Sequence, residues 1–432
     1  MTHWQFPMPI SSLSNYAAEA IDRWRRGLPA DAALRDFMSR HPRFPQAGRT
    51  KLVRAVFAYF RWLRWLEESE TLPAQIEAAT AVQDRFERDP KNLKDQTLAA
   101  RAVPEWVWTE LDFGKGTPAE TRKFQWVRSL QATPPLWLRA RPGTSAKVAA
   151  ALGNCRPAPS PACPDALRYA GSADLFRTAA FNQGDFEIQD LASQLVGAAC
   201  APQPGDTWWD ACAGEGGKAL HLADQMRNKG TVWCSARSAR RLENLKRRFS
   251  RAELYNYRVA PWDGGPRLPT KGKFDGILVD APCSGLGTWA RNPDARWTTT
   301  PKDVAELAAV QLQLLNHVAG SLKPGGRLIY AVCTLTRSET TAVAAAFAAA
   351  HPELEPYTLD AGNWKPDTGG PKPGVARQVQ DPESAVAAAF SRSSGDQEAA
   401  NPPSAARTPP FLTLWPQELS ANGMFLAAWR RR

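Results

Sequence analysis

Two cysteines in this sequence each follow a short apolar run that predicts a buried strand. Cys283 comes shortly after the run 274–279, and Cys333 comes directly after the run 327–332. The carboxyl ends of strands form the edge at which open α/β sheets carry their chemistry. A single cysteine at such a place is more often a small buried apolar residue. Two of them at one edge, the first preceded by Asp280, predict a pair of catalytic thiols.

A glycine-rich loop stands upstream of both cysteines. A predicted strand ends at Asp210, the loop covers residues 211–217, and residues 219–226 have a helical pattern. A strand, a glycine-rich turn and a helix allow a ligand to approach the backbone closely. The loop has neither the spacing of a P-loop nor the Gly-x-Gly-x-x-Gly spacing of dinucleotide sites. A ligand site and a plain tight turn both fit these residues.

The residues that follow the next two predicted strands help to decide which ligand the glycine-rich loop could bind. The strand 231–235 ends at Ala236, where nucleoside-binding folds usually carry a carboxylate for the ribose hydroxyls. Asp263 follows a third strand near 257–260. It either accepts a hydrogen bond from an adenine amine, with Trp262 over the ring, or caps its own loop.

The composition limits the class of protein. The 432 residues are enough for two or three domains, and the net charge of +11 suits nucleic acid, an anionic membrane surface or a merely basic protein. No apolar stretch approaches the ~20 residues of a membrane span, and the amino terminus has no signal-peptide pattern. Seven cysteines without framework spacing predict reduced thiols and a cytoplasmic location. Scattered histidines and the absence of a Cys-x-x-Cys motif predict no metal site.

The chain divides into three predicted regions. Residues 12–128 are helical, residues 129–181 form a small α+β region, and residues 182–432 have the strand–helix repeat typical of a parallel sheet. Residues 366–410 are rich in Pro, Ser, Ala, Gly and Gln, and this composition predicts a mobile insertion. The runs 411–415 and 424–429 predict two final strands that form an antiparallel pair at the edge of the sheet.

The clearest predicted helix, Arg49–Glu68, carries a basic face. Its apolar residues follow helical spacing. On another face, intervals of three and seven bring together Lys51, Arg54, Arg61 and Arg64. This face is either a stripe that binds nucleic-acid phosphates or a solvated surface of a helical bundle.

With these motifs in place, the chain resembles the Sun/Fmu-type RNA cytosine-C5 methyltransferases of the RsmB/NOP family. The stretch 280–285 matches the family motif Asp-Ala-Pro-Cys-Ser-Gly fully. Residues 210–218 resemble the motif Asp-x-Cys-Ala-Ala-Pro-Gly-Gly-Lys, with Gly214-Glu215 in place of Ala-Pro. Cys333 and the residues around it resemble Thr-Cys-Ser-Leu, and Glu339 matches an acidic position just beyond.

The resemblance implies a fold, a cofactor and a substrate. The fold is a class I methyltransferase Rossmann-like α/β domain, preceded by an all-helical NusB-like RNA-binding domain and a small α+β linker domain, as in the 16S ribosomal RNA branch. The cofactor is S-adenosylmethionine, the partner is RNA with ribosomal RNA favoured, and the protein is expected to be a monomer. The stretch 184–193 resembles the segment that opens the methyltransferase domain, and 291–297 resembles the stretch that contacts RNA.

The resemblance also implies roles for individual residues. It assigns to Cys333 the attack on C6 of cytosine, while Cys283 acts as a base or helps to expel the enzyme from C6. Asp280 holds the ring edge as an acid, and Lys218 orients Asp280 or lowers a thiol pKa. The expected cofactor-binding residues are Cys212, Ala213, Gly214, Glu215, Gly216, Gly217, Lys218, Asp263 and Asp280. The expected RNA-binding residues are Arg54, Arg61, Arg64, Arg291 and Arg296.

One position departs from the family pattern. Alignment of residues 231–242 puts Ala236 where the ribose-binding Asp belongs. Loss of one charge-assisted hydrogen bond weakens binding by about 1.5–3 kcal/mol. A non-catalytic RNA-binding protein on the same fold is therefore one rival interpretation, and transfer RNA as the substrate is another.

Overall fold

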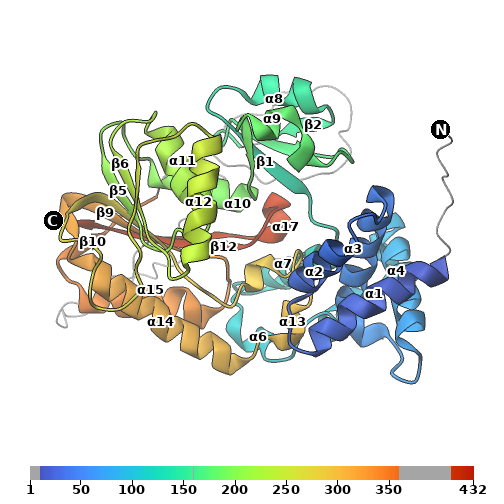
Figure 1. Cartoon of the computed structure of the whole chain (residues 1–432). Helices are drawn as coiled ribbons and strands as arrows, with labels where there is room; N and C mark the ends of the chain where they lie inside the picture. Colours follow the sequence, from blue (N-terminus) through green and yellow to red (C-terminus); the bar gives the residue numbers. More distant parts are fainter. Residues whose placement is uncertain (1–9, 159, 360–409) are drawn as a thin grey trace, which may run out of the picture.

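The computed structural model describes residues 10–158, 160–359 and 410–432. A helical region, a small sheet and a large sheet follow one another along the chain (Figure 1). The predicted insertion at 366–410 lies outside the described residues except for its last position. No helix in these three described ranges is long and apolar enough to cross a membrane.

The amino-terminal region is a bundle of helices around an aromatic core. Its helices are α1 (Ile10–Arg25), α2 (Ala30–Arg40), α3 (Gln46–Arg61), α4 (Leu72–Arg88), α5 (Asp95–Arg101), α6 (Val107–Glu110) and α7 (Thr117–Gln131). Phe60 and Trp126 are fully buried between them. The predicted helix that contains the basic face ends at Arg61, earlier than expected, and a short 3-10 turn follows.

A small antiparallel sheet follows the bundle. Its elements are β1 (Leu136–Ala140), α8 (Ser145–Leu152), β2 (Cys155–Pro157), β3 (Ala166–Tyr169), α9 (Ala179–Asn182) and β4 (Phe186–Ile188). The strand order is β2-β3-β1-β4. Phe186 pairs with Ala140, so the small sheet extends past the predicted boundary at residue 181.

The carboxyl-terminal region is an open, mostly parallel sheet. Its strands are β5 (Thr207–Asp210), β6 (Thr231–Cys234), β7 (Tyr257–Val259), β8 (Phe274–Asp280), β9 (Leu322–Val332), β10 (Leu354–Pro356), β11 (Phe411–Leu414) and β12 (Met424–Arg431). The order is β10-β12-β9-β8-β5-β6-β7, and β11 also pairs with β12. The chain order reverses between β5 and β8, where open α/β sheets bind ligands. The predicted antiparallel pair of final strands is confirmed.

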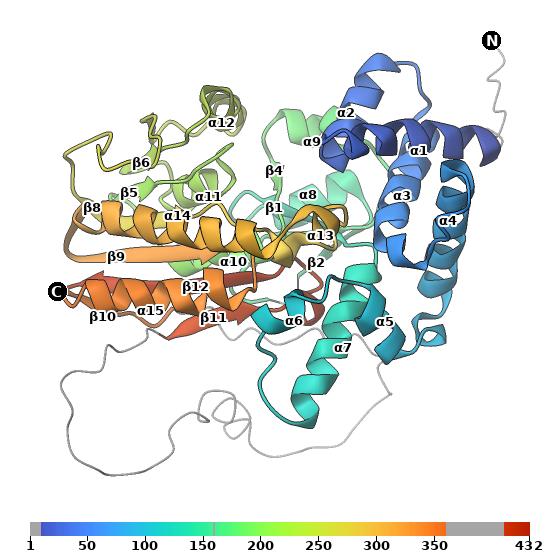
Figure 2. The same cartoon turned by 90° about the horizontal axis from the view of Figure 1, so that it is seen from below.

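Helices cover both faces of the large sheet (Figure 2). One face carries α10 (Leu191–Cys200), α11 (Gly217–Gln225) and α12 (Ala239–Arg251), and the other carries α14 (Pro301–Ala319) and α15 (Thr341–Ala350). Two short helices, α13 (Ala295–Thr298) and α17 (Pro416–Leu419), lie against the bundle. Trp208 packs toward the first layer and Trp209 toward the second, as alternation along a strand requires.

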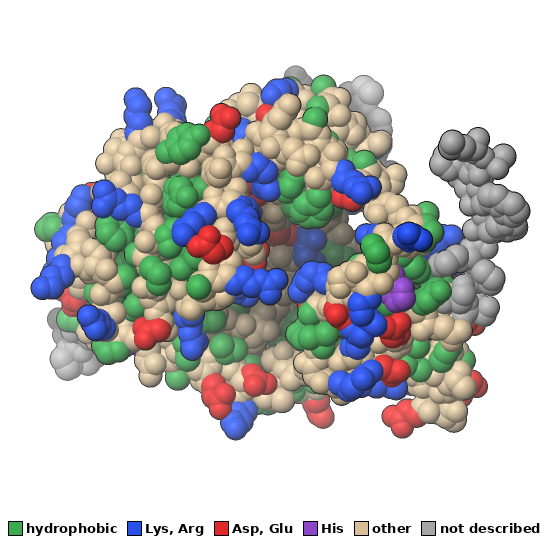
Figure 3. Space-filling view, in the orientation of Figure 1, with side chains coloured by type: hydrophobic (Ala, Val, Ile, Leu, Met, Phe, Trp, Pro, Cys, Tyr) green, Lys and Arg blue, Asp and Glu red, His purple; other side chains and the backbone are tan. Residues whose placement is uncertain are grey.

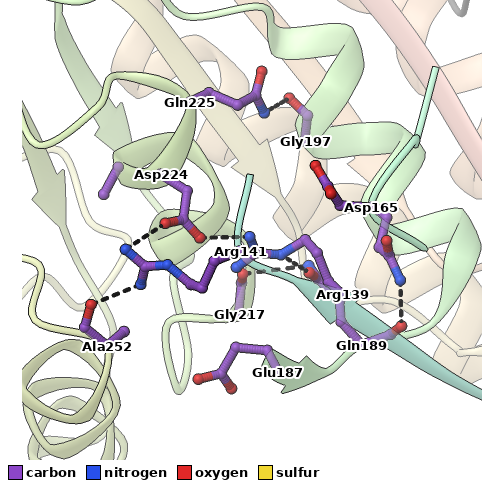
Figure 4. A network of polar contacts seen from close by, with 12 residues as sticks. Arg139, Arg141, Asp165, Glu187, Gln189, Gly197, Gly217, Asp224, Gln225 and Ala252 are labelled. Atoms are coloured by element: carbon purple, nitrogen blue, oxygen red, sulfur yellow. Dashed lines mark hydrogen bonds and ion pairs between the residues drawn. The ribbon is translucent and has the colours of Figure 1, made fainter. Parts of the chain in front are cut away.

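Buried polar contacts tie the small sheet to the large one (Figure 4). Arg139 in β1 forms a buried ion pair with Asp224 in α11, and Arg141 binds the same carboxylate at 2.9 Å. The Gln189 side chain accepts a hydrogen bond from Arg139 Nε at 2.7 Å and donates one to the Gly217 carbonyl at 3.3 Å. Because Gly217 begins α11, these contacts fix the end of the glycine-rich loop relative to the small sheet.

The helical bundle docks on the chain segment that follows β8. Trp289 of this segment is buried within the core of the bundle. Arg61 Nη2 donates to the Ala290 carbonyl at 3.1 Å, and Trp297 Nε1 donates to the Phe60 carbonyl at 2.7 Å. The segment that starts at the first cysteine loop therefore forms much of the contact between the two largest regions.

Two of the predicted RNA-binding arginines lie inside this contact. Arg296 is 0% exposed, and its guanidinium donates to the carbonyls of Leu130 and Trp289 and to Gln131 Oε1. Burial lowers the pKa of Arg296 well below its ordinary value and lowers the pKa of Arg61 to about 10. The prediction that Arg61 and Arg296 bind RNA is wrong, because both side chains are buried and satisfy main-chain oxygens.

Arg296→Leu should destabilise the fold by about 3 kcal/mol, because several buried acceptors lose their charged donor. Chemical unfolding of the variant and the parent measures this difference. Arg156→Leu, at an exposed position in β2, is the control and should change the free energy of unfolding by less than ~0.5 kcal/mol. An Arg296 variant that is as stable as the parent but binds RNA less tightly would restore the original assignment.

Candidate active site

The two predicted catalytic thiols meet at the carboxyl edge of the large sheet. β8 and β9 are parallel neighbours with Asp280 opposite Ala331, so the loops after them begin side by side. Cys283 Sγ lies 3.3 Å from Cys333 Sγ, and both side chains are half-buried. The structure therefore brings together the two residues that first indicated a site.

The two thiols differ in acidity. Their hydrogen bond raises the pKa of Cys283 well above its ordinary value, and burial acts in the same direction. The same hydrogen bond lowers the pKa of Cys333, although burial and Asp280 oppose it, and Lys218 lowers it further. Either sulfur can donate in this contact, and the nearby Lys218 charge favours Cys333 as the acceptor. Cys333 is favoured as the thiolate, which is the nucleophilic form of cysteine.

A buried carboxylate, to which the sequence motifs give no role, joins the two cysteine loops. Glu339 is 0% exposed and accepts from both the backbone N–H, at 2.8 Å, and the hydroxyl of Ser284 in the first loop. In the second loop it accepts from Thr336 at 2.8 Å and Thr334 at 3.2 Å, and Gln311 donates to it at 2.9 Å. A buried charge is costly unless it is hydrogen-bonded, so these contacts hold the two thiols at their observed separation.

Lys218 and Asp280 form an ion pair beside the thiols, with Nζ 2.8 Å from Oδ2. Burial lowers the pKa of Lys218, but the Asp280 carboxylate more than offsets this effect, so the pKa lies above its ordinary value. Asp210 at the end of β5 is 1% exposed, and burial together with Asp280 raises its pKa to about 7. Within the described residues Asp210 Oδ2 has no hydrogen-bond partner.

The glycine-rich loop turns tightly between β5 and α11. Gly214 and Gly216 have φ angles of 54° and 85°, in the left-handed region that favours glycine. A Cβ at Gly216 would lie 2.7 Å from Leu245 Cγ in α12, so close packing excludes a side chain there. A Cβ at Gly214 would meet nothing closer than Arg241 Nη1 at 3.9 Å, so the backbone is open at this point. The predicted cofactor-binding residues 212–218 thus form one loop that is accessible at Gly214.

The position expected to serve the ribose has no carboxylate. Ala236 is buried at the end of β6. The neighbouring Ser235 hydroxyl donates to the Ala260 carbonyl at 2.6 Å and accepts from Trp209 Nε1 at 3.0 Å. Because both of these bonds lie inside the protein, Ser235 does not replace the missing ribose ligand.

Asp263 and Trp262 have partners of their own. Asp263 Oδ1 accepts from the Gly265 backbone N–H at 2.8 Å, as the loop-capping alternative predicts. Trp262 is 5% exposed, and its ring packs on Trp209 with centroids 5.2 Å apart. Trp262 therefore belongs to the core, whereas Asp263 Oδ2 remains available to a ligand.

The remaining arginines of the predicted basic face also have partners within the protein. Arg54 forms ion pairs with Asp84 at 2.6 Å and with Glu87 at 2.5 Å in α4. Arg64 lies 5.0 Å from the centre of the Trp297 ring. Arg61 is buried and Arg54 is paired, whereas Lys51 and Arg64 are exposed. The four residues therefore do not form one continuous phosphate-binding stripe, and RNA contacts of Arg54 and Arg64 stay predictions.

Arg291 has partners as well. Its guanidinium donates to the Pro135 carbonyl at 2.8 Å and lies 3.0 Å from Asp190 Oδ2. These contacts link the first cysteine loop to the beginning of the small sheet. A phosphate would have to displace them, so Arg291 holds segments together in the structure and its RNA contact stays a prediction.

Comparison with known proteins identifies the family. The sequence model of the family "16S rRNA methyltransferase RsmB/F" matches residues 198–430, just over half of the chain. The chain belongs to this family. A Bacillus subtilis protein described as "Probable ribosomal RNA small subunit methyltransferase B" is 40% identical over 178 residues, which are 41% of this chain and 40% of that protein. A Synechocystis protein of the same description is 32% identical over 297 residues, covering 65% of this chain and 63% of that protein.

Solved structures support the fold of this RsmB/F family member. The structure described as "Crystal Structure of PH0851" has a TM-score of 0.70 at 19% identity and covers 99% of this chain and 100% of its own. NSun6 from Pyrococcus horikoshii with SFG has a TM-score of 0.56 at 17% identity, covering 72% and 95%. The predicted fold class, a helical region before a Rossmann-like methyltransferase domain, is confirmed. The prediction of S-adenosylmethionine as cofactor is confirmed at the level of the family. The chain spans only 40% and 63% of the lengths of the two relatives.

Cys283→Ala should raise the pKa of Cys333, because the thiolate loses its hydrogen-bond donor. Since the thiolate is the form that is alkylated, the midpoint of iodoacetamide alkylation at Cys333 should move to higher pH, as mass spectrometry of its peptide measures. Lys218→Met should move the midpoint in the same direction. Cys155→Ala, outside the site, is the control. An unchanged midpoint in Cys283→Ala would show that the hydrogen bond does not stabilise the thiolate.

Proposed function

We propose that this chain methylates C5 of a cytosine in small-subunit ribosomal RNA, through a covalent bond between Cys333 and C6 of the base. The observation that carries the proposal is the pair of thiols 3.3 Å apart, in which Cys333 alone has a lowered pKa. One thiol is prepared to attack, and the other keeps its proton beside it. Membership of the RsmB/F family supports the choice of substrate.

Cytosine C5 is a poor nucleophile until a sulfur adds to the ring. Cys333 Sγ donates an electron pair to C6, the C5–C6 double bond opens, and negative charge develops near N3 and O2. S-adenosylmethionine, when bound, supplies the electrophilic methyl group that C5 takes up. A water molecule from solvent then takes the proton from C5, the C5–C6 double bond forms again, and the electrons of the C6–S bond return to sulfur. Cys283 keeps its proton and donates a hydrogen bond to the departing thiolate.

Lys218 and Asp280 are the charged groups that serve the ring. The negative charge near N3 and O2 needs a donor. Asp280 is the candidate group at the base edge, and Lys218 Nζ, 2.8 Å from Asp280 Oδ2, keeps its proton and places a positive charge beside it. The lowered pKa of Cys333 depends in part on the same lysine, so Lys218 acts on both the nucleophile and the ring.

The residues around the glycine-rich loop fit S-adenosylmethionine. The backbone is open at Gly214, and Asp210 Oδ2 is a buried acceptor without a partner among the described residues. A cofactor with an amino group and a sulfonium charge matches both features. Residues 212–218, Asp280 and Asp263 would hold it, with Asp263 Oδ2 as acceptor for the adenine amine.

A second candidate is a non-catalytic RNA-binding protein on the same fold. Ala236 favours it, because Ser235 is already engaged and no carboxylate stands at the end of β6. Transfer RNA is the alternative substrate within the enzyme interpretation. We also propose that the protein is a monomer. We propose a cytoplasmic location, because two thiols 3.3 Å apart stay reduced only in reducing surroundings.

Cys333→Ala should abolish methyl transfer to RNA while RNA binding stays within about twofold, because the nucleophile alone is lost. Cys283→Ala should instead accumulate a covalent protein–RNA complex, since release from C6 slows. Denaturing gels with labelled RNA detect the complex as a retarded band. Accumulation in Cys333→Ala and not in Cys283→Ala would reverse the two roles.

Ala236→Asp should tighten binding of S-adenosylmethionine, because the ribose hydroxyls gain an acceptor worth about 1.5–3 kcal/mol. Calorimetric titration of the variant and the parent measures the gain. Ala236→Asn, which is similar in size but uncharged, is the matched control and should gain less. If neither the parent nor the variant binds the cofactor at millimolar concentration, the non-catalytic interpretation is the better one.

A further inference from the structure

The helix α12 carries a face of exposed arginines that the site does not use. Arg237, just before the helix, and Arg240, Arg241 and Arg247 within it are all exposed. In the described part of the chain, none of these four side chains forms an ion pair or a hydrogen bond. Lys and Arg side chains lie over this part of the surface and around the hollow beside it (Figure 3).

One of the four arginines lies close to the glycine-rich loop. Arg241 Nη1 would be 3.9 Å from a Cβ at Gly214, the open point of the glycine-rich loop. Asn244 Nδ2 in α12 donates to Glu215 Oε1 at 3.1 Å, so the helix is fixed against the same loop. Arg240 and Arg247 are seven residues apart, which places them on one side of the helix about 10 Å apart along its axis.

Two of the carboxylates near this face are already paired with cations, and a third, Glu215, accepts a hydrogen bond from Asn244. Glu243 lies 2.7 Å from Lys246, and Glu187 forms ion pairs with Arg248 and Arg251 at the other end of α12. Ala236 stands directly before Arg237, at a position where a carboxylate would have reduced the local positive charge. The amino terminus of α12 adds a further partial positive charge. The face therefore presents unneutralised positive charge to anything that enters the hollow.

We propose that the four arginines on and before α12 bind phosphates of the RNA strand that flanks the target nucleotide. This inference rests on the proposed function and names a surface for its substrate. A base can reach the thiols only when the strand around it runs over the edge of the sheet, and α12 begins at this edge, directly after β6. Arg54, Arg61 and Arg296 are paired or buried, which favours other cations as the groups that contact phosphates.

The test replaces Arg237, Arg240, Arg241 and Arg247 with Gln in the full chain. A matched control removes four exposed cations from the opposite edge of the sheet, namely Lys229, Lys271, Arg430 and Arg432. Affinity for a short fluorescein-labelled single-stranded RNA is measured by anisotropy between about 50 and 200 mM KCl. Titration with S-adenosylmethionine and thermal unfolding accompany each variant.

The α12 variant should lose about three units of log–log salt slope, since each phosphate contact with a single strand contributes about 0.7. The control should lose less than one unit, and both variants should bind S-adenosylmethionine as the parent does. The double variant Arg240→Gln, Arg247→Gln should lose about half as much slope as the quadruple variant. This double variant keeps the proposal testable if the quadruple variant folds poorly.

Equal losses of salt slope in the α12 variant and the control would overturn the proposal, because the effect would then depend only on the total charge of the protein. An unchanged slope in the α12 variant would also overturn it. Loss of S-adenosylmethionine binding with RNA affinity intact would assign the arginines to the cofactor. If the parent methylates no RNA but the α12 variant still loses salt slope, the arginines bind RNA as proposed and the proposed methyltransferase activity is wrong.

Discussion

The hydrogen bonds to Glu339 are the constraint on which the rest of the site depends. This carboxylate is completely buried and accepts from five groups on the two cysteine loops and on α14. Without these donors the buried charge would be strongly unfavourable, so the loops cannot separate at low cost. The 3.3 Å contact between the thiols, and with it the difference in their acidity, follows from this fixed geometry.

The same loops also hold the helical bundle. Residues just after Cys333 bind the bundle, because Ser338 donates to both carboxylate oxygens of Glu110. The segment after Cys283 enters the core of the bundle through Trp289. The bundle thus stabilises the loops that carry the chemistry, and its arginines are used in doing so. This use of arginines favours other surfaces for the recognition of RNA phosphates, and we have proposed the exposed arginines of α12 for this role.

Local patterns made part of this structure predictable. Each cysteine follows an apolar run, and parallel strands place such positions at one edge, so their approach could be inferred. The burial of Arg61 and Arg296 could not, because charged residues are seldom fully buried and helical spacing shows which residues share a face but not what covers it. Trp289 and Trp297, before and after Arg296 in the sequence, were the available signal that this segment is buried. The position of Glu339 matched the family, but its role could not be inferred, because Ser284 and Gln311, which also donate to it, lie far away in the sequence.

The central claim is that Cys333 bonds to C6 while Cys283 retains its proton. Incubation of the parent protein with S-adenosylmethionine and RNA that contains 5-fluorocytosine tests it most directly, because fluorine at C5 blocks proton removal and preserves the bond. Protease digestion and mass spectrometry then identify the modified cysteine. The account predicts that the RNA is attached to the peptide that contains Cys333. Attachment at Cys283, or no attachment in a protein that binds both ligands, would contradict it.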